Sequence, residues 1–328
     1  MFPRAYVNYR DLDKIRERST HPTVLSLYGT LNIDQVVNTK IKIYVDIDRG
    51  EFCDRAFGEF IEFVEIMYNY VLGLIVDPIE NKVLFDVGQG GSVLVHNSKL
   101  LGIDLHDVDV IALSHRHYDH TGGIVDILKN IGRRVPVVAH PDVLKPGIVI
   151  SESRVDFGAG IPCSEGELRG LSNLVLARTP IQLAPSVWWL GEVPRKTSYE
   201  REPDWSYTVS EDKLVRDPLK DDTGIVISIE GYGAAVVVGC SHSGIVNIVE
   251  HASEVIGEVP KAVIGGLHLI SASEDVIKKT ISDLRRLGVE EVHVGHCTGL
   301  KAEAMMASEF GDGFAKIYSG YKVVIGTE

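Results

Sequence analysis

Short apolar runs alternate with amphipathic segments along most of this chain. Residues 108–113 and 135–140 have the length and apolar content of buried strands, whereas residues 124–131 and 274–287 space their apolar side chains as one face of a helix does. The same criteria predict strands at 41–46, 72–75, 82–85, 224–229, 234–238, 262–264 and 291–294, and helices at 57–70 and 246–256. This order predicts an α/β (α+β) fold in which two mixed sheets pack face to face beneath outer helices.

Residues 151–222 interrupt this pattern. They contain few clear elements, become acidic toward their end, and carry a series of prolines at 162, 180, 185, 194, 203 and 218. We expect this stretch to be an insertion that covers the substrate, within a domain that spans residues 40–328. Residues 1–39 form an N-terminal extension with three open roles: capping the active-site edge, mediating a dimer, or extending the outer helical layer.

Composition and charge narrow the class of protein. With 328 residues, 45% of them hydrophobic and 24% charged, the chain has the balance of one large globular domain. A net charge of −13 argues against a nucleic-acid partner, which needs a basic surface. The apolar runs are too short for a membrane span or a signal peptide, so we expect a cytoplasmic protein whose four cysteines are reduced.

The most informative stretch is residues 114–123, Ser-His-Arg-His-Tyr-Asp-His-Thr-Gly-Gly, between a predicted strand and a predicted helix. In extended backbone, residues two apart share a face, so His115 and His117 can bind one ion while Asp119 and His120 turn toward a second. The alternative is a pair of surface histidines beside an Asp119 that only caps the next helix. It leaves four potential ligands within six residues unexplained, so we predict a two-metal catalytic site.

This stretch resembles the signature of the metallo-β-lactamase superfamily, His-X-His-X-Asp-His on a loop after a core strand. Residues 84–88, Leu-Phe-Asp-Val-Gly, are similar to the first motif of that superfamily. The resemblance implies that Asp86 supports the metal loop without itself binding metal. It also implies a four-layer αββα sandwich with the metals at one edge of the two sheets.

Further motifs are similar to those of a narrower family, the archaeal 7,8-dihydropterin-6-methyl-4-(β-D-ribofuranosyl)aminobenzene-5′-phosphate synthases and their bacterial relatives. They follow the family's order from about Lys40 to the C-terminus, at residues 88–89, 96–97, 191–195, 239–247, 265–269 and 295–299. One departure lies between Phe60 and Pro78, where residues 65–73 stand in place of a Glu-His-Gly-type turn.

Histidines at later strand ends complete two coordination spheres. We assign one ion to His115, His117 and His242, and the other to Asp119, His120 and His296. His242 and His296 have a second interpretation, as buried histidines held by hydrogen bonds. His268 is expected to act in catalysis by binding metal or substrate, or else to bond a backbone carbonyl. The two divalent ions are expected to be zinc, with manganese and iron as alternatives, because these ligand types accept all three.

A bridging carboxylate is not obvious. Many relatives carry an aspartate after a glycine at the end of a late strand, whereas this chain has Cys240 after Gly239, and also Glu192 after Gly191. Cys240 and Glu192 are therefore the candidates for a bridging or supporting role. Cys240 has two other interpretations, a nucleophile beside His242 or a small packed residue.

Cationic and aromatic side chains in the expected insertion suit a small, anionic, phosphorylated aromatic substrate. Arginine can hold a phosphate through two hydrogen bonds, and aromatic rings can stack on a heterocycle. The candidates are Arg195, Lys196, Tyr199, Trp205 and Tyr207. The alternative is that these aromatic residues only attach the insertion to the rest of the domain.

Two enzyme hypotheses compete. In the first, which the resemblance implies, the metals and Arg195 bind the diphosphate of a dihydropterin-methyl diphosphate while a ribofuranosylaminobenzene phosphate attacks, as in methanopterin-type cofactor biosynthesis. In the second, hydroxide generated by the metals and positioned by Asp119 hydrolyses a phosphoester, a thioester or a lactone. A third class, a metal-bearing sensor without catalysis, accounts poorly for the full ligand set. A homo-oligomer is compatible with each of these.

Overall fold

The structure is a computed structural model that describes residues 41–49, 70–77, 82–151 and 155–325. The N-terminal extension 1–39, most of the helix expected at 57–70 and the departure at 65–69 lie outside these residues. Cys163, Cys240 and Cys297 are free cysteines in the described part of the chain, and Cys53 lies outside it.

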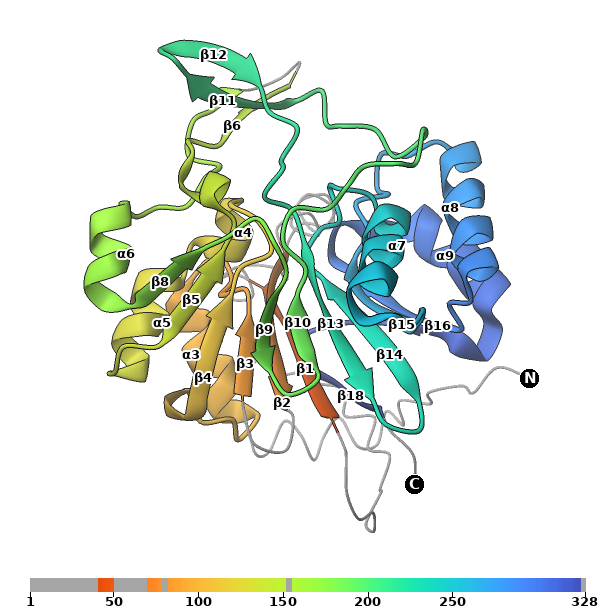
Figure 1. The fold of residues 1–328 in the computed structure, drawn as a ribbon, viewed down its shortest axis with the longest axis horizontal. Coiled ribbons are helices and arrows are strands. Elements are labelled where there is room, and N and C mark those ends of the chain that lie inside the picture. The colour runs from red at the N-terminus through yellow and green to blue at the C-terminus, as the bar shows by residue number, and fades with distance from the viewer. Residues whose placement is uncertain (1–40, 50–69, 78–81, 152–154, 326–328) are drawn as a thin grey trace, which may run out of the picture.

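Two seven-stranded mixed sheets form the centre of the protein (Figure 1). In spatial order, the first contains β18 (Tyr321–Ile325), β1 (Ile41–Arg49), β2 (Tyr70–Asp77), β3 (Lys82–Phe85), β4 (Val108–Ala112), β5 (Pro136–Ala139) and β8 (Asn173–Leu176). The second contains β17 (Phe314–Lys316), β16 (Glu291–Gly295), β15 (Pro260–Gly266), β14 (Gly233–Val238), β13 (Gly224–Ile229), β10 (Val187–Trp189) and β9 (Ile181–Ala184).

Helices cover the outer sides of both sheets, which confirms the predicted four-layer arrangement (Figure 1). One side carries α3 (Gly91–Leu100), α5 (Ile124–Ile131) and α6 (Glu165–Leu171), and the other α7 (Ile245–Ile256), α8 (Glu274–Leu287) and α9 (Leu300–Phe310). Short helices are α4 (Tyr118–Thr121), η2 (Leu105–Asp107), η3 (Pro141–Leu144), η4 (His296–Thr298) and η5 (Gly311–Gly313). Apolar spacing predicted α5, α7 and α8 but not α3 or α9.

Three hydrophobic clusters hold the layers together. Phe85, Trp189 and Ile225 belong to the cluster between the two sheets, where apolar side chains of both inner faces meet. A second cluster joins the outer face of the second sheet to α7, α8 and α9, and a third joins the first sheet to α5. Burial on both faces explains why the central strands are continuous apolar runs in the sequence.

Parallel pairing brings the ends of several strands to one edge of the sandwich. In the first sheet, β3 pairs with β4 and β4 with β5 in parallel; in the second, β14, β15 and β16 are parallel neighbours. The carboxyl ends of parallel strands lie at the same edge, and the loops that follow them carry ligands in α/β proteins. The loops after β3, β4, β14, β15 and β16 contain Asp86, His115, Cys240, His268 and His296.

A small third sheet stands beyond this edge (Figure 1). Its four strands are β12 (Lys213–Arg216), β11 (Ser206–Ser210), β6 (Ile148–Ile150) and β7 (Val155–Asp156), in that order. The expected insertion at 151–222 is therefore too broad, because β8, β9 and β10 from this range belong to the two large sheets. Prolines between these strands mark the ends of short core strands here, rather than the absence of structure.

Candidate metal centre

Asp86 organises the loop that follows β4. Its two carboxylate oxygens accept hydrogen bonds from the backbone nitrogen and the hydroxyl of Ser114, both at 2.7 Å, and Oδ2 also lies 2.7 Å from Nδ1 of His120. The Ser114 hydroxyl lies 2.8 Å from Nδ1 of His115. Because the Ser114 hydroxyl donates to Asp86, its oxygen accepts from Nδ1 of His115, and the Nε2 atoms of His115 and His120 lie on the far side of each ring from this network.

Three buried imidazoles converge beside this network. Nε2 of His115 lies 2.9 Å from Nδ1 of His117, and the His242 ring centroid lies 4.9 Å from each of their centroids. Burial is the largest cause that lowers the pKa of His115 and of His242 well below the usual range, and it lowers the pKa of His117 to about 4. All three rings are therefore neutral near pH 7, which is the form that binds metal.

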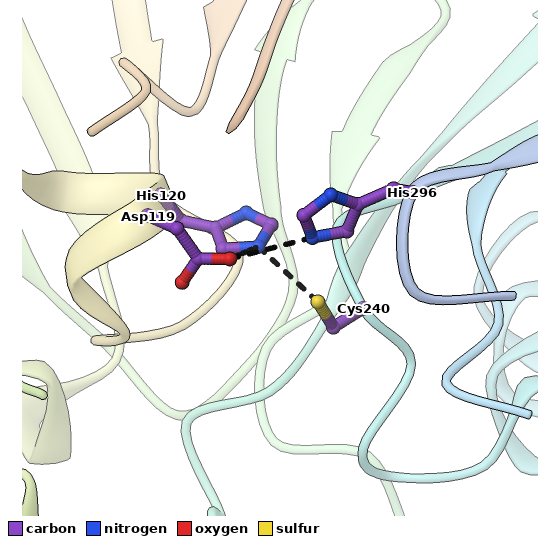
Figure 2. Close-up of side chains that lie close together, drawn as sticks. All are labelled: Asp119, His120, Cys240 and His296. Atoms are coloured by element: carbon purple, nitrogen blue, oxygen red, sulfur yellow. Dashed lines mark hydrogen bonds and ion pairs between the residues drawn. The ribbon is translucent and has the colours of Figure 1, made fainter. Parts of the chain in front are cut away.

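A second group of potential ligands contains Asp119, His120, Cys240 and His296, whose side chains lie close together (Figure 2). Oδ2 of Asp119 lies 3.5 Å from Nε2 of His120 and 3.4 Å from Nε2 of His296, and Nε2 of His120 lies 3.2 Å from Sγ of Cys240. One ligand atom from each of these four residues lies within 4.8 Å of the others. Asp119 does not cap α5, whose N-cap is Gly123, so its carboxylate is available to this group.

Cys240 belongs to both groups. Its sulfur lies within 4.8 Å of ligand atoms of His115 and His242, and within the same distance of ligand atoms of Asp119, His120 and His296. The side chain is 4% exposed, so it lies inside the cluster rather than on its rim. Cys240 is therefore common to both groups, and it stays a candidate for the bridging role.

The donor atoms of this cluster fit divalent metal ions. Several buried imidazole nitrogens have no hydrogen-bond partner among the described residues: Nδ1 and Nε2 of His242, Nδ1 of His268 and Nδ1 of His296. Buried polar atoms are rarely left unpaired, and each one costs stability. A cation bound through one nitrogen of His242, together with neighbouring imidazole, carboxylate and thiolate groups, would satisfy one of these atoms, and this mixture of ligands is typical of zinc and iron sites.

Strained backbone marks the same strand ends. Asp86, Ser241, His268 and His296 have φ values of 63°, 61°, 46° and 53°, in the left-handed region that non-glycine residues rarely adopt. Each residue lies one to three positions after the end of β3, β14, β15 or β16. Such strain persists where the surrounding structure imposes it, and it turns these side chains toward a common centre.

His268 and Trp205 lie against the histidine cluster. The His268 ring centroid is 4.2 Å from that of His242. The Trp205 ring is 5.7 Å from His117, 5.7 Å from His242 and 5.6 Å from His268 between centroids. Trp205 directly precedes β11, so the small third sheet begins above the cluster and places an aromatic ring over it. His242, His268 and Trp205 also line an adjoining cavity of about 190 Å³.

Sequence comparisons agree with this geometry. Residues 75–146 match a β-lactamase superfamily domain. The 7,8-dihydropterin-6-methyl-4-(β-D-ribofuranosyl)-aminobenzene-5′-phosphate synthase of Methanocaldococcus jannaschii is 36% identical over 247 residues, which is 74% of this chain and 84% of that protein. The chain belongs to this synthase family of the metallo-β-lactamase superfamily. An uncharacterised protein of the same archaeon is 30% identical over 226 residues, covering 68% of this chain and 82% of that protein.

A solved structure gives the same fold. Tm1679, described as a metal-dependent hydrolase of the β-lactamase superfamily, is 26% identical to this chain, with a TM-score of 0.69. The match covers 88% of this chain and all of that structure. Within the described residues, the structure contains no helix that is both long and apolar enough to cross a membrane.

Two predicted residues belong to other interactions. The carboxylate of Glu192 lies 3.2 Å from Nε2 of His140 and 3.1 Å from Arg178, apart from both ligand groups, so it does not bridge them. Lys196 is exposed and pairs with Glu254 on α7 at 2.5 Å, so it does not reach the site. In both cases the side chain pairs with an opposite charge that is distant in the sequence, and this pairing holds it away from the site.

Other residues of the expected insertion serve the fold. Arg195 donates to the backbone carbonyl groups of Pro218 and Leu219, which ties its loop to the segment before β13 and occupies part of the guanidinium that we expected to bind phosphate. Tyr207 lies in β11 between β6 and β12 and does not line the cavity. Tyr199 does line it, with its hydroxyl donating to Asp283 at 2.6 Å.

Three residues at or near the site were not predicted from the sequence. Cys297 lies with Cys240 and His268 in a third group of potential ligands, and Glu200 lines the cavity. Arg116 is completely buried and pairs with Asp217 and Asp221. These ion pairs fix the loop that begins at Ser114 and carries the candidate ligands. Arg116 lies within the motif, between two histidines, and this position was the available signal for a supporting role.

Replacing Asp86 with asparagine should weaken metal binding. The amide cannot accept from Ser114 and His120 through two charged oxygens, so the orientation of His120 is lost, and such supporting residues are worth about 10–100-fold in metal affinity. The measurement is a competition titration against a chromogenic chelator. Asp104→Asn, at an exposed aspartate that caps η2, is the control and should keep the affinity of the wild type.

Proposed function

We propose that this protein condenses (7,8-dihydropterin-6-yl)methyl diphosphate with 4-(β-D-ribofuranosyl)aminobenzene 5′-phosphate and releases diphosphate. The observation that carries this proposal is the 36% identity to the synthase over 84% of its length. Potential ligand side chains from four separate strand ends, those of β4, β14, β15 and β16, converge at the site, which supports an intact catalytic centre rather than a fold kept for another purpose.

The side chains of the site divide the work. His115, His117 and His242 would hold one divalent ion, Asp119, His120 and His296 a second, and Cys240 would lie between them. Bound there, the ions would supply positive charge to the departing diphosphate. In the proposed reaction the carbon–oxygen bond to diphosphate breaks, a carbon–nitrogen bond to the arylamine forms, and the amine loses a proton.

Residues near the cluster would handle this proton and limit water. His268 has an unpaired buried Nδ1 and lies against both the cluster and the cavity, so we assign it the proton from the amine. Trp205 covers His117 and His242, and an apolar ring at this place would keep water from competing with the amine. Excluding water is what separates a transferase from a hydrolase at such a centre.

The test is a mass-spectrometric assay with both substrates. Metal-loaded protein should form the condensed product and diphosphate, and His117→Ala protein should form neither. Dialysis against a chelator should abolish the product, and adding back zinc, manganese or iron one at a time should restore it, which identifies the metal. If the protein instead hydrolyses phosphoesters, thioesters or lactones and leaves the pterin pair unchanged, it is a hydrolase and the proposal fails.

A further inference from the structure

The cavity beside the histidine cluster has the size of one flat ring system. An apolar cavity of about 150 Å³ admits a benzene-sized ring. The cavity here, about 190 Å³, is slightly larger, and its walls include Trp205, Ile245, Leu267 and Val276. Such walls suit an aromatic ring. A ring with a ribose and a phosphate attached would not fit inside.

A half-buried carboxylate is among the polar groups of this cavity. Glu200 lines the cavity, and its two oxygens accept hydrogen bonds from the backbone nitrogens of Val246 and Asn247 at 2.9 and 3.1 Å. These nitrogens begin α7, so Glu200 already occupies the place where the helix would attract an anion. Burial, the largest cause, raises the pKa of Glu200 to about 7. Arg201 also lines the cavity, but a phosphate placed beside Glu200 would be repelled by this carboxylate, whereas a neutral ring with N–H donors would be stabilised by it.

We propose that the cavity binds the pterin ring of the first substrate, with Glu200 accepting a hydrogen bond from an N–H group of its aminopyrimidinone edge. This inference rests on the proposed function. A carboxylate has about four lone-pair sites; the helix nitrogens use two of them and the Thr197 side chain a third, so Glu200 can accept one more hydrogen bond.

This orientation also places the rest of the substrate. His242 and His268 are shared between the cavity and the ligand cluster, so a ring in the cavity lies next to the cluster. The methylene group then points toward the histidines, and the diphosphate lies over the residues that would hold metal. The aminobenzene ring fits this cavity less well, because its amine must stay free to attack and its ribose phosphate needs room outside.

Two variants test the proposal with 6-hydroxymethylpterin, a fragment that lacks diphosphate. Glu200→Gln presents an amide N–H to the donors of the ring, and losing a hydrogen bond to a charged group should weaken fragment binding by at least about tenfold. Val276→Trp fills the cavity without touching Glu200 and should abolish binding. Glu254→Gln, at an exposed glutamate of α7, is the control and should bind as the wild type does. Titration calorimetry measures all four proteins.

Turnover measured in parallel separates the two proposals. Glu200→Gln should raise KM for the dihydropterin diphosphate while KM for the arylamine stays constant. Unchanged fragment binding in both variants, no binding to the wild type, or a rise in KM for the arylamine alone would overturn the placement of the pterin ring, with the synthase activity still standing. Fragment binding that both variants lose, in a protein that makes no condensed product, would support the ring site and overturn the synthase proposal.

Discussion

His242→Ala should reduce the rate of condensed-product formation by at least about 1,000-fold, because a cation held there would contribute several kcal/mol to stabilising the charge on the departing diphosphate, and each 1.4 kcal/mol is worth about tenfold in rate. His242 has the geometry of a ligand: its ring lies 4.9 Å from those of His115 and His117, and both its nitrogens are unpaired within the described part of the chain. Elemental analysis of the purified variant should show less bound metal than in the wild type.

Unfolding measurements separate metal binding from folding in this variant. Since His242 makes no hydrogen bond through its ring with the described residues, metal-free His242→Ala should unfold at about the same urea concentration as metal-free wild type. The wild type should gain stability when metal is added, and the variant should gain less. His106→Ala, at an exposed histidine outside the site, is the control. A variant that keeps its metal and its activity would exclude His242 as a ligand.

Local sequence patterns predicted the strands that position the candidate site. Each ligand motif follows a predicted apolar strand, and the structure has strands ending just before Asp86, Ser114, Cys240, His268 and His296. Alternation and apolar runs are local properties, so they can be recognised without knowing the fold. Once the strands are known to be parallel, the gathering of these residues at one edge follows from the direction of the chain.

Side chains whose partners are distant in sequence could not be placed in this way. Lys196 pairs with Glu254 on α7, Arg195 donates to carbonyl groups of a later loop, and Glu200 accepts from the start of α7. Local sequence gives no indication of these pairs, and the three side chains have different partners although they lie within six residues of one another. The strands at 173–189 were missed for a related reason: they are three or four residues long and lie between prolines and turns.

The third sheet is the feature that most changes the picture of the site. Its strands β6 and β7 precede β8 to β10 in the chain, and its strands β11 and β12 follow them. Because β8 to β10 belong to the two large sheets, the two halves of the third sheet are connected through those sheets. The backbone nitrogen of Tyr118, inside the metal loop, donates to the carbonyl of Ala159 next to this sheet at 3.0 Å. Trp205 is therefore held by paired strands, and its position over the histidines is fixed more firmly than a free loop would allow.

Trp189 links the core to the metal loop. It is completely buried between the two sheets, and its Nε1 donates to the carbonyl of Leu113 at 3.1 Å. Leu113 directly precedes Ser114, the residue that Asp86 holds in place. Trp189 thus stabilises the sandwich through its buried area. It also fixes the end of β4, where the loop that carries the candidate ligands His115 and His117 begins.

Trp189→Ala should lower the free energy of unfolding by about 3–5 kcal/mol, because it leaves a cavity between the sheets. It also leaves a buried carbonyl unpaired. Trp189→Phe keeps most of the ring and removes the donor, so it should cost about 1–3 kcal/mol, the usual penalty for an unsatisfied buried group. Urea unfolding of metal-free protein measures both.

Trp188→Ala, at the half-buried neighbour that packs toward α7 instead, is the matched control and should cost less than Trp189→Ala. An equal loss of unfolding free energy in the two alanine variants would show that Trp189 does not stabilise the fold more than Trp188 does. If Trp189→Phe had the unfolding free energy of the wild type, the hydrogen bond to Leu113 would not contribute to stability.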